Sequence, residues 1–146
     1  MKTLIIEDEK AAVRNVKAVL EQVAPDIEVI DVLDCVEDAI DWFRAHPMPE
    51  LVFMDIHLAD GSAFEIFEHT DITCPIIFTT AYDEYALQAF KSQGIDYILK
   101  PFDEEEILRA LEKVRNWFAK EKKAPRTVRF QERFLVQIGT KIKSVP

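Results

Sequence analysis

Five residues of this 146-residue sequence carry side chains that could together bind a metal ion and handle a phosphoryl group. They are three carboxylates, one hydroxyl and one ammonium: Glu7, Asp8, Asp55, Thr80 and Lys100. Carboxylate oxygens without cysteine or histidine nearby suit Mg²⁺, which also takes water and a phosphoryl oxygen as ligands. A carboxylate can act as a nucleophile and form an aspartyl phosphate, while a cation, a lysine and a hydroxyl stabilise the three equatorial oxygens of the phosphoryl group. These residue types indicate Mg²⁺-dependent phosphoryl chemistry, provided that the fold brings them together.

Each of these residues also has a simpler structural explanation when it is taken alone. Asp8 could be a helix N-cap, Asp55 could cap a turn, and Thr80 could be a turn hydroxyl. Lys100 alone could be a solvated cation at the end of a strand. Taken together these explanations fail, because two like charges about 4 Å apart repel by about 4 kcal/mol at an effective dielectric constant of 20. Three carboxylates in one crevice therefore require a bound cation or retained protons.

The elements that must position these residues alternate along the chain. Short apolar runs predict five strands, over Thr3–Ile6, Ile27–Leu33, Leu51–Met54, Pro75–Thr79 and Ile95–Leu99. Apolar residues at helical spacing predict five helices, over Glu9–Val23, Val36–His46, Ser62–Glu68, Tyr82–Gln93 and Asp103–Lys122. This alternation predicts an α/β fold, a doubly wound (βα)5 parallel sheet of five strands with helices on both faces. Such folds bind ligands outside the carboxyl ends of the strands, which is where the candidate residues lie.

The net charge changes sign near Pro125. The first 124 residues hold 26 acidic and 13 basic side chains, whereas the remainder holds 1 acidic and 5 basic, which accounts for the net charge of −9. An acidic body is repelled by DNA phosphates. Phe134–Ile138 and Lys141–Val145 flank Gly139-Thr140 and predict a hairpin, which is marginally stable by itself. We therefore expect that the chain stops just inside a second domain.

Composition and missing motifs exclude several classes of protein. The chain is 49% hydrophobic and 31% charged, as globular domains are. No apolar run approaches the ~18 residues of a membrane span, and no leader is evident, so we expect a cytoplasmic protein with reduced, buried cysteines, Cys35 and Cys74. The three glycines are too far apart for dinucleotide-binding or P-loop motifs, and neither HExxH nor GxSxG occurs.

The segments IIEDE, LVFMDIHLADG, IIFTTAY and IDYILKPF follow one another on the predicted βα repeats. In this order they resemble the receiver domain of two-component response regulators, over about Met1–Lys122. The resemblance implies a flavodoxin-like receiver fold with strand order 2-1-3-4-5, and Asp55 as the acceptor of a phosphoryl group from a sensor histidine kinase. It implies Mg²⁺ as the cofactor, held by Asp8, Asp55 and the backbone carbonyl of His57, with Glu7 acting through a metal-bound water. Receivers of this kind are not enzymes beyond their own phosphorylation and dephosphorylation.

The same resemblance assigns the remaining site residues. Thr80 is the hydroxyl that bonds the phosphoryl group, and Lys100 pairs with a phosphoryl oxygen. Thr80 and Tyr97 form the conformational switch, although Tyr97 could instead be an ordinary half-buried strand aromatic. His57 and Tyr82, two residues after the phosphoacceptor and after Thr80, would set the lifetime of the phosphoryl group, and the bulky Tyr82 predicts slow self-hydrolysis. Both could also be plain solvated loop residues.

The loop after the phosphoacceptor departs from the family pattern. Receivers usually carry a proline here, in the pattern DIxMPxxxG, whereas this chain has Ala59 at the proline position and Leu58-Ala59-Asp60-Gly61 as the loop. We expect the loop to be looser than usual without a change in any ligand.

YALQAF followed by IDYILKPF resembles the subgroup whose output module is a LytTR DNA-binding domain, and RFLVQIGTKIKSVP resembles the first hairpin of that module. We therefore predict a receiver over residues 1–122, a linker over 123–131 and the truncated start of a LytTR domain over 132–146. The implied natural protein is a transcription regulator that forms a homodimer on phosphorylation. It would contact DNA only through the missing domain and would not contact a membrane.

Three alternatives from other classes remain. An aspartate-nucleophile phosphatase requires DxD at the strand end, but this chain has Asp55-Ile56-His57. A flavodoxin-like FMN carrier would have to place phosphate against an acidic first loop, Glu7-Asp8-Glu9, which repels it. A stand-alone receiver that acts only by protein contact stays open.

Overall fold

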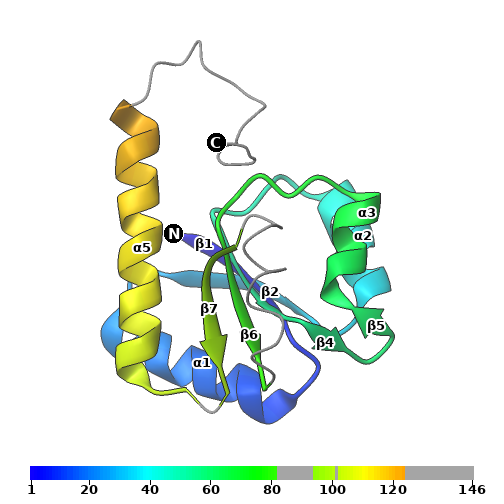
Figure 1. Cartoon of the computed structure of the whole chain (residues 1–146), viewed down its shortest axis with the longest axis horizontal. Coiled ribbons are helices and arrows are strands. Elements are labelled where there is room, and N and C mark those ends of the chain that lie inside the picture. The colour runs from blue at the N-terminus through cyan, green and yellow to red at the C-terminus, as the bar shows by residue number, and fades with distance from the viewer. Residues whose placement is uncertain (82–93, 101, 124–146) are drawn as a thin grey trace.

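The computed structural model describes residues 1–81, 94–100 and 102–123, and its centre is a parallel sheet of five strands (Figure 1). The strands are β1 (Lys2–Ile6), β2 (Glu28–Leu33), β3 (Leu51–Asp55), β6 (Ile76–Thr80) and β7 (Gly94–Leu99). They lie in the order β2-β1-β3-β6-β7, and all pairs are parallel. Since β6 and β7 are the fourth and fifth strands of this sheet along the chain, the predicted order 2-1-3-4-5 is confirmed.

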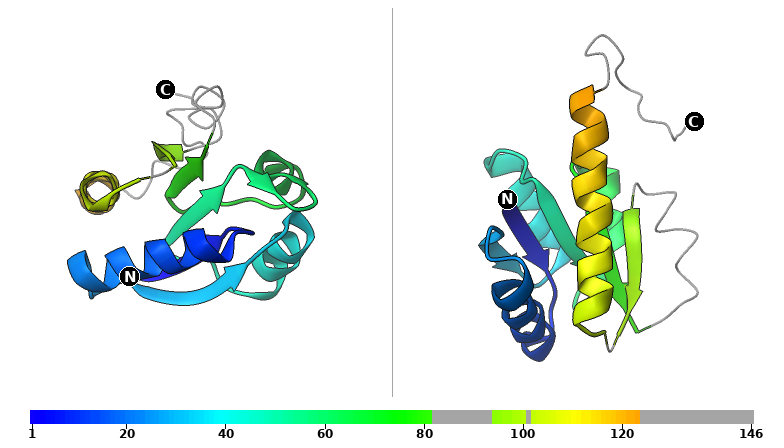
Figure 2. Two further views of the ribbon diagram at one scale, coloured as in Figure 1. Left: turned by 90° about the horizontal axis from the view of Figure 1, so that it is seen from below. Right: turned by 90° about the vertical axis from the view of Figure 1, so that its left-hand side faces the viewer.

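Helices cover both faces of the sheet (Figure 2). One face carries α1 (Lys10–Val23) and α5 (Glu104–Lys123), and the other carries α2 (Val36–Ala45), the 3-10 turn η1 (Ala63–Glu65) and α3 (Ile66–His69). This is the predicted doubly wound arrangement. The predicted helix over Tyr82–Gln93, and the hairpin and domain boundary beyond residue 123, lie outside the described residues.

The alternation of side chains along each strand divides the core into two apolar clusters. The cluster under α2 and α3 takes the strand residues Leu4, Ile6, Val52, Met54, Ile76 and Phe78. The cluster under α1 and α5 takes Ile5, Leu51, Phe53, Ile77 and Ile98. Because strands such as β3 and β6 are buried on both faces, they are apolar up to the polar residues that end them, Asp55 in β3 and Thr79-Thr80 in β6.

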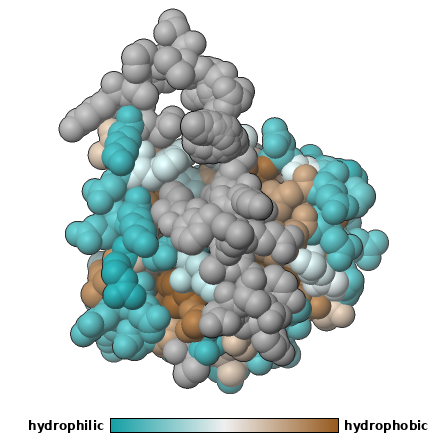
Figure 3. Space-filling view, viewed as in Figure 1, coloured by the Kyte–Doolittle hydropathy of each residue, from teal (hydrophilic) through white to brown (hydrophobic). Residues whose placement is uncertain are grey.

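The last helix, α5, packs against the sheet through one apolar face. Ile107, Leu111 and Val114 of α5 are fully or almost fully buried, and Phe118 packs against the same cluster. The opposite face of α5 is hydrophilic (Figure 3). Among the described residues, no helix combines the length and the apolar character needed to cross a lipid bilayer.

Two local expectations need correction. The residue at the N-cap of α1 is Glu9, not Asp8, and no side chain caps that helix end through a hydrogen bond. Cys74 is buried as expected, but Cys35 is only half-buried, because it is the N-cap residue of α2 and its Sγ accepts the N–H of Asp38 at 3.4 Å. Both cysteines are free.

Candidate functional site

The predicted site residues lie together at the carboxyl ends of the strands. Asp55 is the last residue of β3 and Thr80 the last residue of β6, while Glu7 and Lys100 come directly after β1 and β7. Parallel pairing sets Ile6 of β1 beside Met54 of β3, so the residues that follow these two positions are neighbours. The Lys100 N–H donates to the Thr80 carbonyl at 2.7 Å, which fixes the ends of β6 and β7 in the same way.

Three carboxylates converge in this crevice. Glu7, Asp8 and Asp55 each present an oxygen, and these oxygens lie within 4.8 Å of one another. Glu7 and Asp55 are buried and Asp8 is exposed, so the cluster opens to solvent on one side only. An all-oxygen donor set of this size fits a hard divalent cation such as Mg²⁺, which also keeps several water ligands.

The Lys100 ammonium lies inside this cluster of negative charge. Its Nζ is 2.8 Å from Glu7 Oε1, 3.2 Å from Asp55 Oδ2 and 2.9 Å from Glu9 Oε1. The sequence predicted Lys100 as a partner of the phosphoryl group, and the structure shows it bound to three carboxylates. Repulsion among the carboxylates is therefore offset in part by a cation from the chain itself.

Burial changes the protonation of Glu7. Desolvation raises the pKa of Glu7 from 4.5 to about 7, the hydrogen bond from Lys100 works against this rise, and the neighbouring Asp55 adds to it. Burial also disfavours the charge on Lys100, but its hydrogen bonds to Glu7 and Glu9 hold its pKa above the ordinary value. The crevice thus retains one proton readily near neutral pH and keeps its lysine charged, which is one of the two ways to tolerate crowded carboxylates.

The loop that follows Asp55 is a small hairpin. β4 (His57–Leu58) pairs with β5 (Gly61–Ser62) in antiparallel fashion, and Ala59-Asp60 form the turn between them.

Hydrogen bonds tie this hairpin to α2 and to β3. The Asp60 carboxylate accepts the N–H of Val36 at 2.7 Å and of Glu37 at 3.1 Å, at the start of α2. The Ala63 N–H donates to the carbonyl of Ile56 at 2.8 Å. These hydrogen bonds hold the loop in place although it lacks the proline that would stiffen it. We did not anticipate them from Ala59 in the sequence.

The remaining predicted residues take several positions. The backbone N–H of His57 donates to Asp55 Oδ1 at 3.3 Å, and its side chain is exposed. Thr80 is buried, while Tyr97 on β7 is half-buried and packs against the core cluster under α2 and α3. Tyr82 lies outside the described residues. Glu9 is the partner of Lys100 that the sequence did not predict, since its position after the strand resembles that of any helix-start residue.

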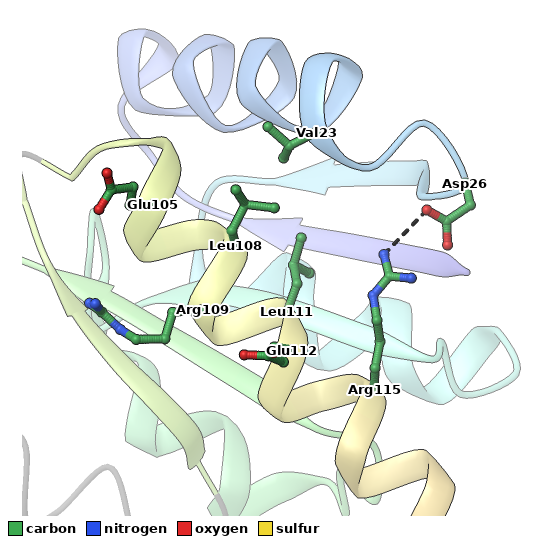
Figure 4. A pocket seen from close by; sticks show the side chains of 8 residues that line it. All are labelled: Val23, Asp26, Glu105, Leu108, Arg109, Leu111, Glu112 and Arg115. Carbon is green, nitrogen blue, oxygen red and sulfur yellow. Dashed lines mark hydrogen bonds and ion pairs between the residues drawn. The ribbon is translucent and has the colours of Figure 1, made fainter.

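A groove on the surface of the described residues lies elsewhere. A hollow of about 620 Å³ runs between α1 and α5, and Arg115 Nη2 pairs there with Asp26 Oδ1 at 3.3 Å (Figure 4). It shares no residue with the acidic crevice. This surface hollow and the cluster of buried charge are therefore separate features.

Comparisons with known proteins agree with this geometry. Residues 3–112 match the family described as the response regulator receiver domain. The chain is 44% identical to the sensory transduction protein LytT of Bacillus anthracis, over 77% of this chain and 46% of that protein. It is 31% identical to the transcriptional regulatory protein LytR of Staphylococcus aureus, over 97% of this chain and 61% of that protein. The chain spans about half the length of the curated relatives it matches.

Two solved structures that share this fold are described as a response regulatory domain and a receiver domain. The response regulatory domain of protein mrkE from Klebsiella pneumoniae superposes with a TM-score of 0.72 at 27% identity, over 82% of this chain and 99% of that one. The non-phosphorylated HemR receiver domain from Leptospira biflexa gives a TM-score of 0.64 at 28% identity, over 77% and 92%.

Proposed function

This chain belongs to the response regulator receiver domain family, and from that premise we propose that it accepts a phosphoryl group on Asp55 from a sensor histidine kinase, with Mg²⁺ bound beside it. The observation that carries the proposal is the convergence of Glu7, Asp8 and Asp55 around Lys100 at the carboxyl ends of the strands. Among the described residues that could hold a metal ion together, no other group of acidic side chains contains two buried carboxylates.

The donor set assigns roles to individual residues. Asp8, Asp55 and the backbone carbonyl of His57 would hold the metal ion, and Glu7 would act through a metal-bound water. When bound, Mg²⁺ supplies positive charge that offsets the carboxylates and the phosphoryl oxygens. Glu7 must give up any proton that it holds before it can take part in binding, since its pKa is raised to about 7.

The transfer itself is a displacement at phosphorus. A carboxylate oxygen of Asp55 forms the new bond to phosphorus, and the bond from phosphorus to the imidazole nitrogen of a phosphohistidine breaks. The bonding electron pair stays on that nitrogen, which then takes up a proton. Lys100 would release a carboxylate and pair with a phosphoryl oxygen, and the Thr80 hydroxyl would donate to another. We expect no turnover of other substrates beyond this transfer and the later hydrolysis of the aspartyl phosphate.

Phosphorylation would change the surface around β7, α5 and the predicted helix over Tyr82–Gln93, which lies outside the described residues. It adds up to about −2 of charge beside Thr80 and Lys100, which would draw Thr80 inward and let Tyr97 rotate into the vacated space. Tyr97 lies on the same strand as Asp96. Asp96 Oδ1 pairs with Lys113 Nζ of α5 at 3.2 Å, so an ion pair links this strand to α5. A homodimer formed through this reshaped surface is the proposed consequence.

The proposed output is a LytTR DNA-binding domain that this chain contains only in part. The match to the LytR protein of Staphylococcus aureus extends over 97% of the chain, which supports a tail that continues into such a domain after residue 132. The proposed boundaries stay at 1–122, 123–131 and 132–146. We propose that the phosphoryl transfer takes place in the cytoplasm, where the two free cysteines would remain reduced.

The lifetime of the phosphoryl group is assigned to His57 and Tyr82. The side chain of His57 is exposed beside the Asp55 loop, where it can meet a water molecule that approaches the phosphoryl group. Slow self-hydrolysis remains our expectation, because of the bulk of Tyr82.

Intact mass spectrometry tests the proposed function. The protein is treated with acetyl phosphate and Mg²⁺, beside a sample in excess chelator and beside the Asp55→Asn variant. We expect the parent to gain one phosphoryl group with Mg²⁺ only, and the variant to gain none. A parent that stays at its original mass would overturn the proposal.

A further inference from the structure

Glu9 is a fourth carboxylate at the mouth of the crevice, outside the set of metal ligands proposed above. Its Oε1 lies 2.9 Å from Lys100 Nζ, and its backbone N–H donates to Glu7 Oε2 at 3.2 Å. The side chain of Glu9 is 66% exposed, whereas that of Lys100 is 16% exposed, so Glu9 reaches the ammonium from the solvent side. Glu9 is the most exposed of the three carboxylates that pair with Lys100.

Among the described residues, the side chain of Glu9 pairs with Lys100 and does not cap the helix that it precedes. Glu9 occupies the N-cap position of α1, but its side chain makes no capping hydrogen bond. A carboxylate at a helix N-terminus gains only a modest electrostatic benefit from the helix dipole, which falls off with exposure and salt. The contact with Lys100 is therefore the specific interaction of this side chain.

The proposed phosphorylation requires Lys100 to exchange a carboxylate for a phosphoryl oxygen. Glu7 and Asp55 are buried and stay in the crevice, so the solvent-facing Glu9 is the partner that an incoming anion can most readily displace. The charge of Glu9 also repels a donor that carries negative charge itself, and this repulsion depends on ionic strength. We propose that Glu9 is a positioning residue that holds Lys100 in the resting state and, by competing with the incoming phosphoryl group, slows phosphorylation of Asp55 by anionic donors.

This inference rests on the proposed function and is tested with Glu9→Gln. The matched control is Glu21→Gln, which removes the same charge from an exposed position on the same helix, about 18 Å away at 1.5 Å per residue. The second-order rate constant for phosphorylation is measured by intact mass with acetyl phosphate and with the less negatively charged phosphoramidate, at low and high ionic strength. Thermal unfolding of all three proteins checks that the fold is kept.

We expect Glu9→Gln to react roughly threefold or more faster than the parent with acetyl phosphate at low salt, and to lose most of this gain at high salt. The gain with phosphoramidate should be smaller, and Glu21→Gln should match the parent throughout. A Glu9→Gln protein that reacts like Glu21→Gln, or more slowly than the parent, overturns the inference. A gain that is the same for both donors and unaffected by salt also overturns it. If the parent takes up no phosphoryl group at all, the proposed function fails; if it reacts and only the expected difference is missing, this inference alone fails.

Discussion

The acidic crevice and the groove between α1 and α5 both join a basic side chain to carboxylates, but in opposite surroundings. In the crevice, Lys100 has a side chain 16% exposed and contacts Glu7 and Asp55 side chains that are 6% and 7% exposed. In the groove, Arg115 is 48% exposed and its partner Asp26 is 55% exposed (Figure 4). Exposed ion pairs contribute little to stability, whereas removing one partner of a buried pair leaves an uncompensated charge.

This difference shows that a hollow in the surface need not be the place where reactive groups gather. The groove is a hollow of about 620 Å³, yet its charges are solvated. Burial alone would raise the pKa of Asp26, but the Arg115 guanidinium outweighs this effect and lowers it. The Asp26 carboxylate therefore stays ionised. In the crevice the pKa of Glu7 is instead raised to about 7, because burial disfavours its charge. Perturbed protonation together with a cation held between buried carboxylates marks the crevice, and not the groove, as the place for chemistry.

Replacing Lys100 should have the largest effect. Lys100→Met leaves Glu7 and Asp55 buried without their cation, and we expect it to lower the free energy of unfolding by about 3 kcal/mol or more in chelator. Arg115→Met, which breaks the exposed pair in the groove, should lower it by less than about 1 kcal/mol. Urea unfolding of both variants and the parent measures the contrast. Equal losses for the two variants would remove the distinction between the regions.

The pH dependence of stability sharpens the same comparison. Since the pKa of Glu7 is about 7 in the folded protein and 4.5 ordinarily, the folded state holds this proton more tightly than the unfolded state. This contribution to stability is therefore present below about pH 4.5 and is lost as the pH rises through about 7, a change on the order of 3 kcal/mol.

Urea unfolding in chelator at several values between about pH 5 and pH 8 measures this change, with Glu7→Gln as the control. As the pH rises across this range, the parent should lose stability relative to the Glu7→Gln variant. A difference that stays constant across this range would show that Glu7 titrates normally.

Replacing Asp55 should have a smaller effect on stability than replacing Lys100, and with the opposite sign. Asp55→Asn removes one negative charge but leaves Lys100 paired with Glu7 and Glu9. We expect the metal-free variant to be more stable than the parent by about 1 kcal/mol, because less repulsion remains among the carboxylates. Unfolding in chelator measures this gain, which should shrink when Mg²⁺ is added to both proteins. Lowered stability in chelator would contradict the description of the crevice as overcrowded with negative charge.

Most of the fold could be predicted because its signals are local. Uniformly apolar strands such as β3 and helical stripes such as that of α5 are written in consecutive residues, and the alternation of the two specifies a parallel doubly wound sheet. The ends of elements were less certain. Thr80 proved to be the last residue of β6 instead of the first residue after it, and Glu9 proved to be the N-cap of α1 in place of Asp8.

The site was predicted as a set of positions but not as a set of contacts. Topology brings Glu7, Asp55 and Lys100 to one edge of the sheet, so their proximity follows from the order of the strands. The contact between Glu9 and Lys100 depends on side-chain reach between residues 91 positions apart, which no sequence pattern encodes. The same holds for the hydrogen bonds of Asp60 to the start of α2, which hold the hairpin after Asp55 in place.

Chemical mapping of the phosphorylated residue tests the central claim most directly. The parent protein is treated with acetyl phosphate and Mg²⁺, the acyl phosphate is reduced with borohydride, and the modified aspartate, now homoserine, is located by peptide sequencing in a mass spectrometer. We predict a single modification at Asp55 that is absent when chelator replaces Mg²⁺. Modification at Asp8 or at a carboxylate outside the crevice, or none at all, would contradict the account.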